Sequence, residues 1–204
     1  MTKLSNAVAR ALPQTVHITT WRDTAEGRVA FNAAGVIVRA DGLILTNYHV
    51  VKDAISLEIV TFDNQIFIGQ VVASDDKADV ALVQIKAHTP LPTVTFAPAD
   101  SLRRGDMVFL IGSPMGYRFS VCHGMVGHTN RDRPDWYSIP LLQTDAPTNV
   151  GNSGGGVFDD TGRLVGLHVS AAAGALGISF SLRLDGVLTI ANHLLQEIGQ
   201  NLLI

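Results

Sequence analysis

The feature that most constrains the fold is a series of short segments rich in β-branched residues and separated by Gly, Asp and Asn turns. Six segments precede a proline-rich stretch at 87–101, and six follow it. The first series reads VHITTW, AAGVIVRA, GLILTNYHVV, SLEIVTF, QIFIGQVVAS and DVALVQIKA; the second reads DMVFLIGSP, FSVCHGMVGHTN, SIPLLQTDA, GGVFDD, GRLVGLHVSA and LGISFSLR. This pattern predicts an all-β protein of two packed, six-stranded antiparallel β-barrels.

Both ends of the chain have helical spacing instead. Residues 3–12 place apolar side chains on one face before Pro13, and residues 185–199 repeat that period. We therefore expect a single domain over 1–204, with an N-terminal barrel at 14–87, a C-terminal barrel at 102–184 and a closing helix at 185–199. Short N-terminal and C-terminal helices complete the prediction.

Composition limits the function classes. The 204 residues are 47% hydrophobic, which suffices for a packed core, and Cys122 is the only cysteine, so no intrachain disulfide can form. A net charge of −3 without a basic run argues against nucleic acid as a partner. No apolar run reaches the ~18 residues that a membrane span needs. Because no secretory signal begins the sequence, we expect a cytoplasmic protein as given, or a periplasmic or cell-envelope protein if it is processed.

The strongest chemical signal is the run Gly151-Asn152-Ser153-Gly154-Gly155. A serine among glycines allows a tight turn that presents the hydroxyl and lets backbone N–H groups converge on one point. The expected oxyanion-binding residues are Gly151, Asn152 and Ser153, with the N–H groups of Gly151 and Ser153 as donors. On its own, the run is equally compatible with a glycine-rich hairpin.

Two further segments supply the partners of a nucleophilic serine. His49 ends an apolar strand pattern in TNYHV, and Asp79 begins another in DVALV. A serine nucleophile needs a base for its proton, and the imidazole needs a carboxylate that fixes its tautomer. Singly, His49 reads as an ordinary histidine and Asp79 as a strand-edge charge. Together with Ser153, in the chain order His, Asp, Ser, they predict a catalytic triad in a cleft between the barrels.

These segments resemble a known family. The blocks TNYHVV, SDDKADVALVQI, QTDAPTNVGNSGGGVFDDTGRLVGL and GISFSLR are similar to those of the HtrA/Deg serine proteases, a branch of the trypsin/chymotrypsin-like superfamily. The resemblance extends from about residue 14 to about 195. It implies the chymotrypsin-like fold, the triad His49, Asp79 and Ser153, and an ATP-independent endopeptidase that acts on protein or peptide substrates. It implies no metal and no organic cofactor.

The sequence departs from the family pattern at two places. Only 11 residues follow His193, so we expect no PDZ domain, and Val150 replaces the usual proline before the Gly-Asn-Ser turn. The family's trimers, assembled through an N-terminal segment, suggest a homotrimer with residues 3–20 at the contact, an expectation by analogy alone.

The expected substrate-binding residues are Thr148, His168, Val169 and Ser170. The threonine and the histidine match, in their offsets from Ser153, residues with which the staphylococcal glutamyl endopeptidases bind an acidic side chain. A hydroxyl and an imidazole can both donate hydrogen bonds to a carboxylate. The alternatives are a strand histidine that points elsewhere and the preference of HtrA enzymes for small aliphatic residues.

Other clusters carry weaker signals. Cys122, His123 and His128 do not complete a zinc ligand set, because consecutive strand residues face opposite sides. Asp75 and Asp76 read as solvated turn charges. The loop 130–137 contains Trp136 and Tyr137, which either regulate the active site or cover a barrel end.

Two alternatives to a general endopeptidase remain open. One is a binding protein with little turnover, whose loop Pro147–Asn152 is held in an inactive form. The other is a processing protease with one dedicated substrate. An intact triad favours the two protease hypotheses over the binding protein.

Overall fold

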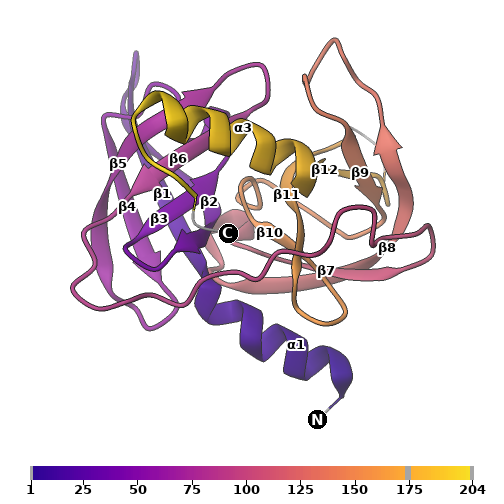
Figure 1. The fold of residues 1–204 in the computed structure, drawn as a ribbon. Coiled ribbons are helices and arrows are strands. Elements are labelled where there is room, and N and C mark those ends of the chain that lie inside the picture. The colour runs from indigo at the N-terminus through magenta and orange to yellow at the C-terminus, as the bar shows by residue number, and fades with distance from the viewer. Residues whose placement is uncertain (1, 173–175, 203–204) are drawn as a thin grey trace.

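The computed structural model describes residues 2–172 and 176–202, and its strands form two closed six-stranded barrels (Figure 1). The first barrel has the strand order β1-β2-β3-β6-β5-β4, and neighbouring strands are antiparallel. Its strands are β1 (Thr15–Thr24), β2 (Gly27–Arg39), β3 (Leu43–Thr46), β4 (Ser56–Thr61), β5 (Ile66–Asp75) and β6 (Val80–Gln84).

The second barrel repeats this architecture in the order β10-β11-β12-β9-β8-β7. Its strands are β7 (Met107–Gly112), β8 (Ser120–Arg131), β9 (Leu141–Thr144), β10 (Gly156–Asp159), β11 (Leu164–Ala171) and β12 (Ser179–Arg183). The helices are α1 (Lys3–Ala11), α2 (Tyr48–Val51) and α3 (Leu184–Glu197), with 3₁₀ turns at Leu12–Gln14 and Pro114–Gly116. The predicted two-barrel fold with short terminal helices is confirmed.

The period-2 alternation of the strands divides the core into layers. In β2, Ile37 lies in the core of the first barrel, whereas Val36 and Val38 lie in a larger cluster that extends into the second barrel. β6 divides in the same way, with Ala81 in the first layer and Val80 in the second. Successive strand residues face opposite sides, so one strand can serve both layers.

The remaining segments join the barrels. The proline-rich linker is bound to both barrels. Val94 N–H donates to the Ile37 carbonyl at 2.9 Å, and Leu164 N–H donates to the Thr95 carbonyl at 2.8 Å. Helix α3 crosses the molecule and contacts β5 and β6 of one barrel and β11 and β12 of the other (Figure 1). Helix α1 lies under the second barrel, where Lys3 pairs with Asp160.

The structure corrects one local expectation. The segment 42–51 reads as a single strand, but β3 ends at Thr46 and Tyr48–Val51 forms one helical turn. Asn47 between them is extended, with φ −83° and ψ 151°. Within the described residues, no helix has both the length and the apolar character to cross a bilayer.

Two buried histidines make stability depend on pH. Burial lowers the pKa of His17 to about 4 and that of His168 to about 3, both from 6.5. Below pH 6.5 these histidines are therefore protonated in the unfolded chain but stay neutral in the folded chain. Their contribution to the unfolding free energy is full above pH 6.5 and is lost as the pH falls. We expect each histidine to cost about 2 kcal/mol in unfolding free energy between pH 7 and 5.

Urea unfolding of the wild type and of His17→Asn at both pH values measures this effect. The variant should lose less stability than the wild type on acidification, whatever its stability at pH 7. Equal losses in the two proteins would contradict the assignment of a neutral, buried His17.

Candidate active site

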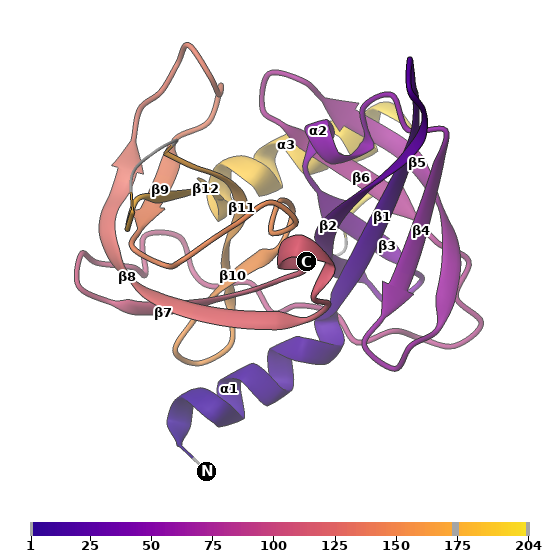
Figure 2. The same cartoon turned by 180° about the vertical axis from the view of Figure 1, so that it is seen from behind.

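His49 is placed at the end of the first barrel by the short helix α2. The helix lies against β5 and β6 (Figure 2). Its C-terminal carbonyls are held from β1, where the Arg22 guanidinium donates to the carbonyls of His49 and Val50 and the Thr20 hydroxyl donates to Val50 at 2.9 Å. The imidazole keeps 45% of its side-chain exposure, so one face stays open to a reacting group.

Asp79 lies at the entry to β6, in a tight turn. Its backbone has φ 55°, which L residues adopt rarely because the side chain crowds the backbone. The turn is closed by the Asp75 carboxylate, which accepts from Ala78 N–H at 2.8 Å, and by Asn47, whose amide donates to the Asp79 carbonyl at 3.0 Å. These bonds compensate the strain and fix the direction of the Asp79 carboxylate.

The two side chains are in direct contact. His49 Nδ1 lies 2.7 Å from Asp79 Oδ2, and His49 N–H donates to the other carboxylate oxygen, Oδ1, at 2.8 Å. The Asp79 side chain is only 8% exposed. A carboxylate that accepts at Nδ1 leaves Nε2 as the ring nitrogen available to a proton donor.

Ser153 lies on a turn that touches the first barrel. Its carbonyl accepts from Ala34 N–H on β2 at 2.9 Å. The next residue, Gly154, has φ 77°, and a Cβ there would lie 2.2 Å from both the Ala34 carbonyl and the Thr46 hydroxyl. Thr46 ends β3, the strand that leads to His49. Because residue 154 is a glycine, the serine turn can pack directly against the end of that strand.

The residues before Ser153 are fixed through their carbonyl groups. Gly151 C=O accepts from Ser113 N–H at 3.1 Å, and Val150 C=O accepts from Met115 N–H at 2.8 Å. Within the described part of the chain, the N–H groups of Gly151 and Ser153 donate to no protein acceptor. Two unengaged N–H groups beside a serine are the donors that an oxyanion hole requires.

Thr148 and His168 approach one another through a residue that the sequence did not indicate. The Thr148 hydroxyl donates to Ser179 Oγ at 3.4 Å, and Ser179 Oγ lies 3.5 Å from His168 Nδ1. Burial, with a smaller contribution from His49, lowers the pKa of His168 to about 3, so its imidazole is neutral. Ser179 belongs to β12, and only the pairing of β12 with β11 brings it to this position.

The other two expected substrate-binding residues differ in character. The Val169 side chain is 4% exposed and belongs to the large core cluster, so only its backbone is available to a substrate. The Ser170 hydroxyl is buried next to the Tyr137 hydroxyl, and within the described residues it makes no hydrogen bond of normal geometry.

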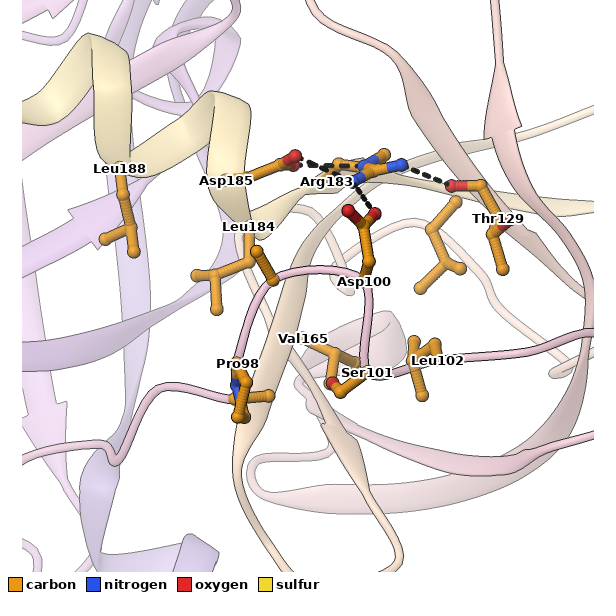
Figure 3. A pocket seen from close by; sticks show the side chains of 13 residues that line it. Pro98, Asp100, Ser101, Leu102, Thr129, Val165, Arg183, Leu184, Asp185 and Leu188 are labelled. Carbon is orange, nitrogen blue, oxygen red and sulfur yellow. Dashed lines mark hydrogen bonds and ion pairs between the residues drawn. The ribbon is translucent and has the colours of Figure 1, made fainter.

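One of two cavities in the described structure adjoins the serine turn, and the other lies apart from the candidate site. One of about 280 Å³ lies behind the serine turn, and its lining includes Thr148, Asn152 and Cys122. Another of about 240 Å³ lies between the linker, β12 and α3, near Arg183 (Figure 3), and contains no candidate triad residue. Among residues 2–172 and 176–202, no group of three His, Cys, Asp or Glu side chains could hold a metal ion.

Comparison with protein-family models identifies the family of this chain. The family model described as "Trypsin-like peptidase domain" matches residues 33–167, which include His49, Asp79 and Ser153. The chain therefore belongs to the trypsin-like peptidase domain family.

Several curated proteins are similar to this chain. A "Probable periplasmic serine endoprotease DegP-like" of Pseudomonas putida (strain W619) is 35% identical over 80% of this chain and 35% of its own length. The protein of the same description from Hahella chejuensis (strain KCTC 2396) is 35% identical over 79% of this chain and 35% of its own. The chain thus spans about a third of the length of these curated relatives.

Solved structures of HtrA-type proteases have a similar fold. "HtrA-type protease AlgW with tripeptide" superposes with a TM-score of 0.88 at 31% identity, over 98% of this chain and 65% of that chain. "HtrA-type protease AlgW with decapeptide" gives 0.87 at 28% identity, over 98% and 69%. This trypsin-like peptidase domain is therefore similar in sequence to DegP-like proteins and in fold to HtrA-type proteases.

Proposed function

We propose that the chain hydrolyses peptide bonds through Ser153, His49 and Asp79. His49 Nε2 removes the Ser153 proton as the hydroxyl attacks the carbonyl carbon, and Asp79 holds the Nδ1 proton and stabilises the imidazolium. His49 then donates its proton to the leaving amine, and water hydrolyses the acyl-enzyme by the reverse sequence of proton transfers. The observation that best supports this function is the 2.7 Å contact between His49 Nδ1 and Asp79 Oδ2 beside the serine turn.

The oxyanion formed in each half-reaction is assigned to the N–H groups of Gly151 and Ser153, with Asn152 as the residue between them. Two bonds support this assignment, those from Ser113 and Met115 to the carbonyls of Gly151 and Val150. They direct these carbonyls toward the second barrel's own turn. Donors that are oriented before the reaction stabilise developing charge without reorganisation.

The substrates proposed are unfolded proteins or exposed protein segments, because a protease cleft accepts extended backbone. The test compares a reduced and alkylated, permanently unfolded protein with its folded parent, each incubated with wild type and Ser153→Ala. Cleavage of the unfolded form, absent with Ser153→Ala, is the expected result. Cleavage of neither form would contradict the general endopeptidase and would favour a dedicated substrate or a binding role.

A preference for acidic residues before the cleaved bond is a finer proposal. Thr148, Ser179 and His168 form a short polar chain next to the serine turn, and neutral His168 retains a ring N–H to donate. Hydrogen bonds to a charged acceptor are stronger than neutral ones, so a glutamate carboxylate would gain most from these donors.

Mapping cleavage sites in a peptide library by mass spectrometry tests this preference. We expect Glu to be enriched at the cleaved position over Gln by about tenfold, the effect of ~1.4 kcal/mol, and His168→Val to abolish the enrichment. Enrichment of Val or Ala with wild type would contradict the acidic pocket while leaving the peptidase function intact.

A homotrimer is a further proposal, based on the resemblance to HtrA proteins. Within residues 3–20, the start of β1 is buried by its pairing with β2 and β4, whereas α1 keeps an exposed face, which includes Ser5, Asn6 and Ala9, for another copy. Met115 and Tyr117, which are 66% and 76% exposed, offer further apolar surface for a contact between copies. Light scattering after size exclusion measures the mass; a monomer at all concentrations contradicts the proposal.

A further inference from the structure

The two barrels meet through very few backbone bonds. Among the described residues, two backbone hydrogen bonds join a segment of one barrel to a segment of the other. One runs from Ala34 N–H to the Ser153 carbonyl at 2.9 Å, and the other from Ser138 N–H to the Lys77 carbonyl at 2.9 Å. The first fixes the candidate nucleophile, and the second fixes the turn that carries Asp79.

The second bond comes from the β8–β9 loop, residues 132–140. Its tip is a compact turn, in which the N–H groups of Trp136 and Tyr137 both donate to the Arg133 carbonyl at 2.9 Å. The Arg133 guanidinium stacks over the Trp136 ring at 3.9 Å. These contacts give the loop a defined shape, so it can act as a brace.

The base of the loop is also held. Arg183 donates to the Asn130 side chain at 3.3 Å, just before the loop begins (Figure 3 shows the arginine at this site). Arg183 in turn pairs with Asp100 at 3.0 Å and with Asp185 at 2.6 Å. The loop is therefore anchored in the second barrel where it begins, and near its C-terminal end Ser138 attaches it to the first barrel.

Tyr137 precedes Ser138 in this loop, and the charge of Asp79 acts on its hydroxyl. Its half-buried ring packs against the large core cluster, which extends over both barrels and includes Ala78 and Val80 on either side of Asp79. Burial raises the pKa of the Tyr137 hydroxyl; the nearby Ser170 hydroxyl opposes this rise, and the negative charge of Asp79 adds to it. The phenol thus lies within the electrostatic reach of Asp79.

We propose that the β8–β9 loop positions Asp79 through the bond from Ser138 N–H to the Asp79 turn, with the neighbouring Tyr137 ring as its support. The inference rests on the proposed function, since it assigns Asp79 to the triad. Asp79 has a strained backbone with φ 55°, and its turn is exposed at Lys77. A strained residue keeps its conformation only when its surroundings over-determine it, and the loop supplies bonds from the opposite barrel.

Two matched pairs of variants test the proposal. Tyr137→Ala removes the ring, whereas Tyr137→Phe retains it. Ser138→Pro removes the backbone N–H, whereas Ser138→Ala retains it and changes only an exposed side chain. We expect Tyr137→Ala and Ser138→Pro to lower kcat by about 10- to 100-fold with little change in KM, the scale of an ångström-sized displacement of a catalytic group. The acid limb of their kcat/KM profiles should move to lower pH. Tyr137→Phe and Ser138→Ala should match the wild type.

A spectroscopic measurement makes the test independent of turnover. The proton between His49 Nδ1 and Asp79 gives a downfield ¹H NMR signal, which should weaken or shift in Tyr137→Ala and Ser138→Pro and persist in their partners. If wild type shows this signal but no Ser153-dependent hydrolysis, the proposed function fails and the signal still decides the inference. An unchanged signal, kcat and pH profile in folded Tyr137→Ala would overturn the inference, even if Ser138→Pro does not fold.

Discussion

Replacing Ser153 with alanine will lower kcat by about 10⁶-fold, the scale seen when a triad nucleophile is removed. The substitution deletes one oxygen at a position whose structural role is played by the backbone, through the bond from Ala34 N–H to the Ser153 carbonyl. We therefore expect the unfolding midpoint to change little. Initial rates on an unfolded protein substrate, together with urea unfolding, measure both effects.

Ser101→Ala is the matched control, because Ser101 is an exposed linker residue. It should retain wild-type turnover. If Ser153→Ala kept activity within tenfold of the control, Ser153 would not be the nucleophile, and another group would have to form the acyl-enzyme.

Replacing Asp79 with asparagine will lower kcat by about 10⁴-fold without removing the turn. Asparagine is nearly isosteric and can still accept from His49 N–H. Its amide group, however, presents a donor to His49 Nδ1, which favours the tautomer with the proton on Nε2 and so removes the base that Ser153 needs. The pH dependence of kcat/KM measures the loss of the neutral-pH plateau.

Asp76→Asn tests whether the effect is specific, because Asp76 lies in the same turn with an exposed side chain. Its activity should equal that of the wild type. A loss of similar size in both variants would mean that the turn's charge, and not the Asp79–His49 contact, controls the rate.

The architecture was predictable because it depends on local patterns. Segments rich in β-branched residues, such as VHITTW and DVALVQI, form the strands β1 and β6, and Asp41-Gly42 marks the β2–β3 turn. The proline-rich linker and the helical spacing after residue 184 are likewise visible in the chain.

Details that depend on contacts distant in sequence were not predictable. His49 lies on a helical turn because Arg22 and Thr20, from another strand, bind its C-terminal carbonyls. The left-handed backbone of Asp79 has no signature at a non-glycine residue. Ser179 joins Thr148 and His168 only because β12 pairs with β11 after a register shift.

The candidate site illustrates the same division. The residue types and their order along the chain suggested His49, Asp79 and Ser153, since the chemistry needs a nucleophile, a base and a carboxylate. The bond between Ser138 and Lys77, and with it the link from the β8–β9 loop to Asp79, appears only when the barrels are packed together.

Covalent labelling by a fluorophosphonate, mapped by mass spectrometry, measures directly whether an imidazole activates the serine between the barrels. We expect one adduct per chain, on Ser153, with labelling slowed by orders of magnitude in His49→Ala because the hydroxyl then lacks its base. An adduct on a different residue, or equal labelling rates of Ser153 in wild type and His49→Ala, would contradict the account.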